Sequence, residues 1–268
     1  MLLKNAPVLF NEQVAANLYH VGFECPDIAR RVQPGQFLMI RVAREFDPLL
    51  RRPFAVHRLE SACIEILYRV VGRGTSILAG LTPGDSINIL GPLGRGFRLP
   101  SGGGPILLVA GGIGIAPLPF LAEILLAAGN TGPHYLLFGA GKAEELVCVD
   151  HLEDLGFVTT VVTEDGSSGE KGLVTDHLER WLDGQQQLPV LIYSCGPYAM
   201  QRKVAHCALR FGIPCQLSME ALMACGVGAC LGCSLRCKPP ASETEPYYAN
   251  VCQHGPVFTA EEIIWEQC

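Results

Sequence analysis

Basic residues are scarce in this chain. Its 268 residues include 20 lysines and arginines against 26 aspartates and glutamates, which gives a formal net charge of −6. The basic residues form no run that would create a local positive patch. Nucleic-acid binding depends on electrostatic attraction to a basic surface, which this composition does not supply. We therefore expect no nucleic-acid partner.

The sequence also lacks an export signal and an uninterrupted membrane span. The opening segment MLLKNAPVLFNEQ has neither the apolar core nor the small-residue cleavage site of a signal peptide. Residues 105–129 carry Glu123 as their only charge, but glycines and prolines interrupt the run, so a buried strand, a turn and a helix explain it better than a membrane span. Twelve cysteines in such a chain suggest a reducing compartment, and we expect a cytoplasmic protein.

Two kinds of periodicity divide the chain. In residues 1–99, alternating apolar runs separated by Gly and Pro turns predict a small antiparallel β-barrel or sandwich; the runs are 37–42, 64–71 and 86–94. After the glycine-rich segment 100–105, apolar strands alternate with helical stretches, which predicts a doubly wound parallel α/β sheet. The expected strand–helix pairs are 106–112 with 117–129, 134–141 with 142–156, 157–166 with 173–182, and 189–197 with 198–212.

The fold class predicted from these patterns is multidomain α/β plus β. We expect an antiparallel barrel over residues 1–99 and a doubly wound nucleotide-binding domain over residues 100–215. From about Pro214 the periodicity fades, and we expect a separate cysteine-rich, ferredoxin-like segment over residues 216–268.

The cysteine-rich segment has a spacing typical of an iron–sulfur protein. Cys225, Cys230 and Cys233 form a C-x4-C-x2-C pattern, and Cys252 follows after a gap of eighteen residues. A zinc site would need a second close pair of ligands, whereas this spacing is that of plant-type ferredoxins, which hold a two-iron two-sulfur cluster. Zinc stays as an alternative metal, and Cys237 or Cys268 as an alternative fourth ligand.

Two motifs in the barrel region resemble the flavin-binding motifs of the ferredoxin–NADP reductase superfamily: RRPFAV at 51–56 and VVGRGTSIL at 70–78. The resemblance implies FAD, with phosphate contacts from one arginine and from a Gly-Thr-Ser turn, and with the RPFA strand against the ring; the residues concerned are Arg52, Pro53, Phe54, Ala55, Gly74, Thr75 and Ser76. At Ala55 the sequence departs from the pattern, because a hydroxyl that bonds flavin N5 is often found there. A barrel strand with exposed arginines is the simpler alternative.

Three motifs point to a nicotinamide dinucleotide. VAGGIGIAPL, at 109–118, follows an apolar strand and opens a helix, which is where a glycine turn seats a pyrophosphate; its glycines are Gly111, Gly112 and Gly114. The CGP motif of the same superfamily implies that Cys195 and Gly196 lie near the hydride-transfer position. Glu164 and Asp165 suit a free ribose 2′-hydroxyl, so we expect NADH rather than NADPH. The alternatives are a buried core cysteine and a solvated acidic loop.

Taken in order, these motifs resemble the electron-transfer subunits of dihydroorotate dehydrogenase B. GEKGLVTD at 169–176 and MACGVGACLGC at 223–233 are the most specific matches. The resemblance implies an FMN-containing TIM-barrel partner subunit, with two copies of each subunit in the assembly. Electrons from dihydroorotate would pass through the partner's FMN, the cluster and FAD to NAD⁺, in pyrimidine synthesis.

The chain itself shows no recognisable acid or base for dihydroorotate chemistry, so we assign it cofactor sites and no catalytic residue. Two other functions remain open. One is the flavin subunit of a ferredoxin- or sulfide-linked NAD(P) oxidoreductase, which shares the C-x-x-G-P-x-F stretch around Cys252. The other is a redox-sensing iron–sulfur protein, which would not require both the GGIGIAP turn and the CGP motif.

Overall fold

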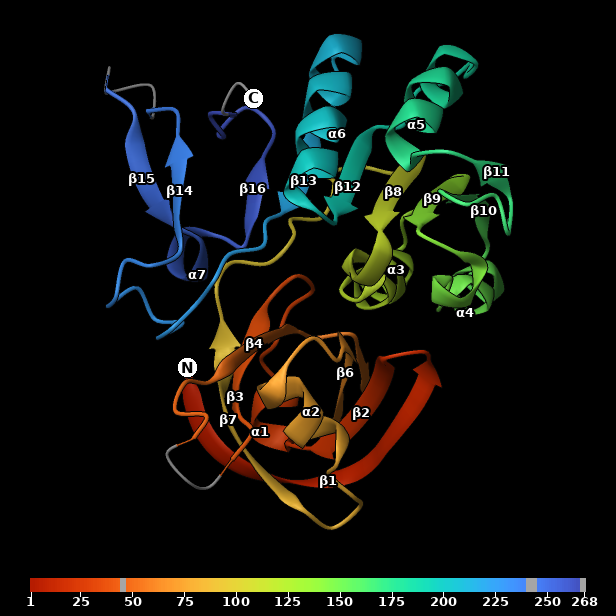
Figure 1. The fold of residues 1–268 in the computed structure, drawn as a ribbon. Coiled ribbons are helices and arrows are strands. Elements are labelled where there is room, and N and C mark those ends of the chain that lie inside the picture. The colour runs from red at the N-terminus through yellow and green to blue at the C-terminus, as the bar shows by residue number, and fades with distance from the viewer. Residues whose placement is uncertain (44–46, 240–244, 266–268) are drawn as a thin grey trace.

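The computed structural model describes residues 1–43, 47–239 and 245–265, so Cys268 lies outside the described residues. Three sheets organise this part of the chain: two of seven strands and one of two strands (Figure 1). The two large sheets correspond to the predicted barrel and the predicted α/β region.

The first sheet is antiparallel and runs in the order β4-β3-β7-β1-β2-β6-β5. Its strands are β1 (Leu2–Ala15), β2 (Leu18–Glu24), β3 (Phe37–Arg41), β4 (Arg52–Ala55), β5 (Arg58–Glu60), β6 (Cys63–Arg69) and β7 (Ser86–Leu93), with helices α1 (Pro26–Ala29) and α2 (Arg73–Ala79) between them. The sheet curls on itself, because Phe54 of β4 meets Tyr68 of β6 with ring centroids 5.7 Å apart. The antiparallel barrel-like architecture is confirmed, and the three predicted runs are β3, β6 and β7.

The second sheet has the order β11-β10-β9-β8-β12-β13-β16 and is parallel except for β16. Its strands are β8 (Ile106–Gly111), β9 (His134–Ala140), β10 (Phe157–Thr163), β11 (Glu170–Lys171), β12 (Leu191–Cys195), β13 (Cys215–Ser218) and β16 (Val257–Thr259). Helices α3 (Leu118–Ala127) and α4 (Val149–Asp154) cover one face, and α5 (Val174–Asp183) and α6 (Tyr198–Phe211) cover the other (Figure 1).

Burial on both faces explains why the strands of this sheet are apolar throughout. In β8, Leu107 and Val109 pack into the cluster with α5 and α6, while Ile106 and Leu108 pack into the cluster with α3. Because successive side chains of a strand point to opposite faces, every position of β8 is buried. The apolar stretch 105–129 therefore forms a strand, the short helix η1 (Gly112–Ile115) and α3, and no helix in the described residues is long and apolar enough to cross a membrane.

One predicted helix proved wrong in detail. Residues 142–156 form the short helix η2 (Ala143–Glu145) and then α4, with a break between them. Cys148 has φ +66° at the N-terminal cap of α4, a left-handed conformation that an α-helix cannot continue through. The other three predicted helices match α3, α5 and α6 to within two residues at each end.

The C-terminal segment packs against both large sheets. Its own elements are β14 (Ser234–Cys237), β15 (Tyr247–Asn250) and α7 (Val251–His254), and β16 then joins the edge of the α/β sheet. A Cβ atom at Gly226 would lie 2.5 Å from Cγ of Met39, so the cysteine loop lies directly on β3 of the barrel. The predicted boundary after residue 215 falls inside β13, and the domain limits stay predictions.

A buried histidine lies between the barrel and the α/β sheet. Nδ1 of His57 donates a hydrogen bond to the carbonyl oxygen of Ala116 (2.7 Å), and the His57 carbonyl accepts one from the N–H of Phe120 (3.1 Å). The next residue, Arg58, pairs with Glu123 of α3 at 2.9 Å. Burial lowers the pKa of His57 from its ordinary value of 6.5 to about 4, so the imidazole is neutral at pH 7.

This burial predicts acid sensitivity. His57 faces the ionisable groups of His20, Glu65, Arg58 and Cys148. The pKa of His57 is lower in the folded than in the unfolded protein, so the free energy of unfolding is about 3 kcal/mol larger above pH 6.5 than near pH 4. His57→Gln keeps a donor for Ala116 without titrating. Urea unfolding at pH 7 and about pH 4.5 should show a smaller acid-induced loss in this variant, and an equal loss in both proteins would contradict the assignment.

Candidate functional site

Strand β4 and helix α2 form one wall of a cleft between the barrel and the α/β sheet. This barrel cleft has a volume of about 450 Å³. Of the predicted site residues, it is lined by Arg52, Pro53, Phe54, Ala55, Thr75 and Cys195. Its lining is largely apolar, with Leu67, Met219 and Met223 among the other side chains, which suits a flat aromatic ring.

The turn that leads into α2 lies beside Arg52. A Cβ atom at Gly74 would stand 2.8 Å from Nε of Arg52, so glycine allows the guanidinium to lie flat against the turn. The hydroxyl of Thr75 accepts hydrogen bonds from the N–H groups of Val71 (2.9 Å) and Gly72 (3.2 Å). Ser76 donates both its N–H and its hydroxyl to the carbonyl of Gly72, and it does not line the cleft. Ser76 therefore closes the turn.

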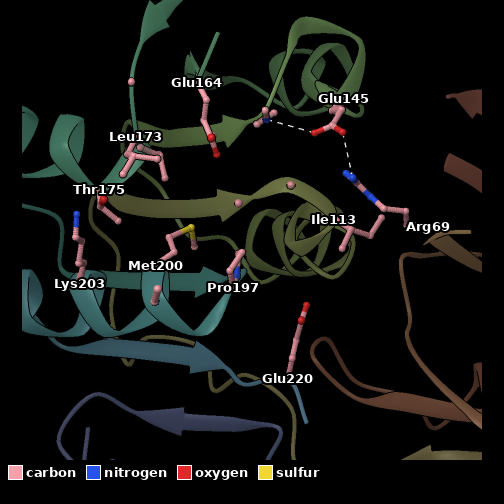
Figure 2. A pocket seen from close by; sticks show the side chains of 18 residues that line it. Arg69, Ile113, Glu145, Glu164, Leu173, Thr175, Pro197, Met200, Lys203 and Glu220 are labelled. Carbon is pink, nitrogen blue, oxygen red and sulfur yellow. Dashed lines mark hydrogen bonds and ion pairs between the residues drawn. The ribbon is translucent and has the colours of Figure 1, made fainter. Parts of the chain in front are cut away.

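A second cleft lies at the carboxyl ends of β8, β9 and β12, the edge where open α/β sheets bind their ligands (Figure 2). This sheet cleft has a volume of about 480 Å³. Gly111 and Gly112 form its floor, and Gly112 has φ +52°, a left-handed conformation that suits glycine. Glu145, Glu164 and Lys203 supply charged groups to its walls.

Gly114 is buried and does not line the sheet cleft. A Cβ atom there would stand 2.3 Å from the carbonyl oxygen of Cys195, so only glycine lets η1 touch the turn that begins at Cys195. Burial raises the pKa of the Cys195 thiol to about 12, which leaves it protonated at pH 7. Gly196, with φ +159°, lines a small neighbouring cleft together with Tyr198 and Glu220.

The two acidic residues predicted near the ribose are not equivalent. Glu164 lines the sheet cleft and follows directly from β10. Asp165 is turned into its own loop, where Oδ1 accepts hydrogen bonds from the N–H (2.9 Å) and the hydroxyl (2.6 Å) of Ser167. These bonds lower the pKa of Asp165. Only Glu164 is placed to meet a ligand in the cleft.

Two residues at the junction of the clefts escaped the sequence analysis. Arg69, at the end of β6, and Glu220, just after β13, each line both the barrel cleft and the sheet cleft. Partial burial raises the pKa of the Glu220 carboxyl. No motif marks either residue: Arg69 is the last residue of β6, and Glu220 lies two residues after the end of β13. The clefts share these two side chains and Ile113, so they adjoin.

The four predicted metal ligands form two thiol pairs. Cys225 interacts with Cys230, and Cys252 interacts with Cys233. Backbone N–H groups point at three of the sulfurs. Cys225 accepts from Val227 and Cys230 (3.4 Å each), Cys252 from Gly228 (3.1 Å), and Cys233 from Cys252 (3.4 Å). In the described part of the chain, no three cysteine, histidine or carboxylate side chains are close enough to hold a single ion.

The loop around these thiols fits an iron–sulfur cluster. The N–H of Val227 lowers the pKa of Cys225 to about 6, so this sulfur is readily held as a thiolate, the form that binds metal. Gly226 and Gly228 have φ +71° and +79°, which lets the loop turn its N–H groups inward. Cys237 is fully buried in β14, and its pKa is raised by burial and by Glu262 rather than by a neighbouring thiol.

Comparison with known proteins identifies the family of this chain. Residues 220–264 match the iron-sulfur cluster binding domain of dihydroorotate dehydrogenase B, and residues 108–206 match the oxidoreductase NAD-binding domain. The electron transfer subunit of dihydroorotate dehydrogenase B (NAD⁺) from Desulforamulus reducens is 38% identical over 264 residues, covering 98% of each chain. That of Bacillus caldolyticus is 42% identical and covers 94% of each. The chain belongs to this family of electron-transfer subunits.

Solved structures agree with the fold. The NADH-dependent reduced ferredoxin–NADP oxidoreductase is 27% identical, with a TM-score of 0.84 over 97% of this chain and 90% of that one. A ferredoxin–NADP⁺ reductase from Neisseria gonorrhoeae, 20% identical over 78% of this chain and 92% of its own, shares the fold with a TM-score of 0.67. The predicted fold class and family are therefore confirmed, and the protein is an oxidoreductase component with NAD-binding and iron–sulfur-binding domains.

Proposed function

We propose that this chain relays electrons between an FMN-containing dihydroorotate dehydrogenase subunit and NAD⁺, through a two-iron two-sulfur cluster and FAD. The proposal rests on the close spacing of the barrel cleft, the sheet cleft and the cysteine loop. The barrel cleft and the sheet cleft share Arg69, Ile113 and Glu220, and the cysteine loop rests on β3 of the barrel through Gly226 and Met39. Electron and hydride transfer both require such proximity.

The barrel cleft fits FAD. Its phosphates would contact Arg52, Gly74 and Thr75. Ser76 would stabilise this turn through its hydrogen bonds to the Gly72 carbonyl. The ring would lie along Pro53, Phe54 and Ala55. A bound flavin supplies the ability to exchange either one or two electrons, which a nicotinamide and an iron–sulfur cluster need in order to communicate. Ala55 offers no hydroxyl to the ring, so at this position only the backbone can form a hydrogen bond with it.

The sheet cleft fits the nicotinamide dinucleotide. Gly111 and Gly112 would seat the pyrophosphate, and Glu164 would accept hydrogen bonds from the adenosine ribose. Cys195 and Gly196 would lie by the nicotinamide, because Cys195, the last residue of β12, lines the barrel cleft that would hold the flavin. The four cysteines that would hold the cluster are Cys225, Cys230, Cys233 and Cys252.

The dihydroorotate site would belong to the partner subunit, in an assembly of two copies of each chain in the cytoplasm. Curated relatives are named as electron transfer subunits, which implies such a partner. The surface beside the thiols suits protein contact, since Val227 and Leu231 are 39% and 64% exposed. The likeness to an NADH-dependent reduced ferredoxin–NADP oxidoreductase makes a ferredoxin-linked enzyme the second candidate.

Reconstitution distinguishes the two candidates. The isolated chain should pass electrons from NADH to artificial dyes but should not interconvert dihydroorotate and orotate. Adding an FMN-containing dihydroorotate dehydrogenase subunit should restore NAD-linked turnover, and Cys225→Ser should abolish this coupling while sparing much of the dye reaction. Robust dihydroorotate oxidation by the isolated chain would contradict the proposal, and coupling to ferredoxin alone would favour the second candidate.

Cysteine variants test the ligand set. Cys225→Ser should lose iron and the paramagnetic signal of the reduced protein, because one thiolate of the pair with Cys230 is removed. Cys237→Ser is the control: Cys237 is a cysteine of the same segment without a neighbouring thiol, and this variant should retain both the iron and the signal. Iron analysis and electron paramagnetic resonance of anaerobically prepared protein decide the question. Zinc in place of iron would overturn the assignment.

Nucleotide preference tests Glu164. Glu164→Ala should reduce the preference for NADH over NADPH by about tenfold, because a charged hydrogen-bond acceptor for the ribose is lost. Asp165→Ala should have a smaller effect, since that carboxylate is engaged with Ser167. Steady-state dye reduction with each nucleotide measures the ratio. Equal use of NADPH by the unaltered protein would show that the ribose assignment is wrong.

A further inference from the structure

The chain crosses from the barrel to the α/β sheet in a segment that both domains hold. This crossing, residues 94–105, follows β7 and leads into β8, and Figure 1 shows it running toward β13 and β12 on its way. The N–H of Phe97 donates to the carbonyl of Pro34 (2.8 Å). Nε2 of Gln36 donates to the carbonyl of Gly94 (2.8 Å). The barrel thus fixes the first part of the crossing.

Two side chains of the α/β sheet hold the backbone of Arg98, further along the crossing. Oε1 of Gln216 accepts the N–H of Arg98 (2.8 Å), and Nε2 of Gln216 donates to the carbonyl of Arg98 (2.8 Å). The hydroxyl of Tyr193 donates to the same carbonyl (2.8 Å). Both side chains are buried, and the ring of Tyr193 meets that of Phe97 edge to face, with centroids 5.3 Å apart. Gln216 and Tyr193 therefore form a clamp on the crossing.

The clamp lies beside the place where flavin and nicotinamide would meet. Tyr193 of β12 pairs in register with Gln216 of β13, and two residues further on Cys195 pairs with Ser218. Side chains two residues apart in a strand point to the same face, so both pairs belong to one face of the sheet. The second pair lines the barrel cleft. Two residues of strand span about 7 Å, which is the separation of the two pairs along the strands.

We infer that Gln216 positions the flavin for hydride transfer by fixing the barrel on the α/β sheet. The inference rests on the proposed function, in which FAD occupies the barrel cleft and the dinucleotide the sheet cleft. Gln216 lines neither cleft, so it acts through the backbone of Arg98 and is a positioning residue. A primary amide suits this role, because it carries an acceptor and a donor side by side and can bind the N–H and the carbonyl of one residue together.

The reaction itself explains why such a clamp matters. Reacting atoms must approach to about 3–3.5 Å, and a displacement of about 1 Å can lower a rate by about a hundredfold. The barrel supplies the wall along the flavin ring, whereas the sheet supplies the glycine turn for the dinucleotide. A small shift between the domains would therefore slow hydride transfer while leaving each cofactor its own contacts.

The chain provides a matched control for the test. Gln36 also donates Nε2 to a carbonyl of the crossing at 2.8 Å, but it precedes β3 directly and its acceptor, Gly94, follows β7 directly, so this bond lies within the barrel. Gln36 likewise lines neither cleft. Gln36→Leu removes a hydrogen bond of the crossing within one domain, whereas Gln216→Leu removes two bonds that tie the crossing to the sheet.

Anaerobic stopped-flow reduction of the flavin-loaded protein by NADH tests the inference. Gln216→Leu should lower the rate of flavin reduction at saturating NADH by about 10- to 100-fold, with unchanged FAD content and an unchanged NADH concentration for half-maximal rate. NADH deuterated at C4 should slow this variant at least as much as the unaltered protein, because hydride transfer itself is impaired. Tyr193→Phe loses one bond and keeps the ring, so its loss should be smaller. Gln36→Leu should react like the unaltered protein.

Unchanged flavin reduction in Gln216→Leu, or an equal loss in Gln36→Leu, would overturn the inference. A loss confined to FAD content or to the half-saturating NADH concentration would also overturn it, because it would assign Gln216 to cofactor binding. If Gln216→Leu does not fold, Tyr193→Phe decides: slower hydride transfer supports the clamp and an unchanged rate contradicts it. Failure of NADH to reduce the flavin of the unaltered protein would instead refute the proposed function.

Discussion

The hydrogen bond from the buried imidazole of His57 to the carbonyl of Ala116 ties together the two halves of the proposed relay. Phe54 and Ala55, three and two residues before His57, line the barrel cleft. Ala116 follows directly after η1, which begins at Gly112 on the floor of the sheet cleft. Residues 54–57 and their hydrogen bond to Ala116 thus connect the two clefts. Because hydride transfer tolerates little displacement between donor and acceptor, the position of one cleft relative to the other is the main constraint on this molecule.

Close backbone approaches maintain the same constraint elsewhere. Gly114 admits the carbonyl of Cys195, which brings the two loops at the edge of the α/β sheet together, and Gly226 admits Met39, which brings the cysteine loop onto the barrel. Each glycine therefore sets a distance between two proposed cofactor sites. The ion pairs of Arg58 with Glu123 and of Arg69 with Glu145 also join the two domains.

Local patterns in the sequence were enough to predict the two sheets, most helices and the cysteine loop, because periodicity and turn residues act over short stretches. They could not separate Glu164 from Asp165, since the hydroxyl of Ser167 decides which carboxylate stays free for a ligand. Arg69, Glu220 and His57 act across the domain junction, where contacts join residues far apart in the chain. The break at Cys148 and the edge strand β16 likewise depend on tertiary packing rather than on any local signal.

The most direct test is an anaerobic titration of the isolated protein with NADH, with absorption and electron paramagnetic resonance recorded on the same samples. If the three sites form one relay, NADH alone should bleach flavin absorption and produce the signal of a reduced two-iron cluster, without any partner subunit. A protein that binds flavin and iron but whose cluster stays oxidised under NADH, while dithionite reduces it, would contradict the account.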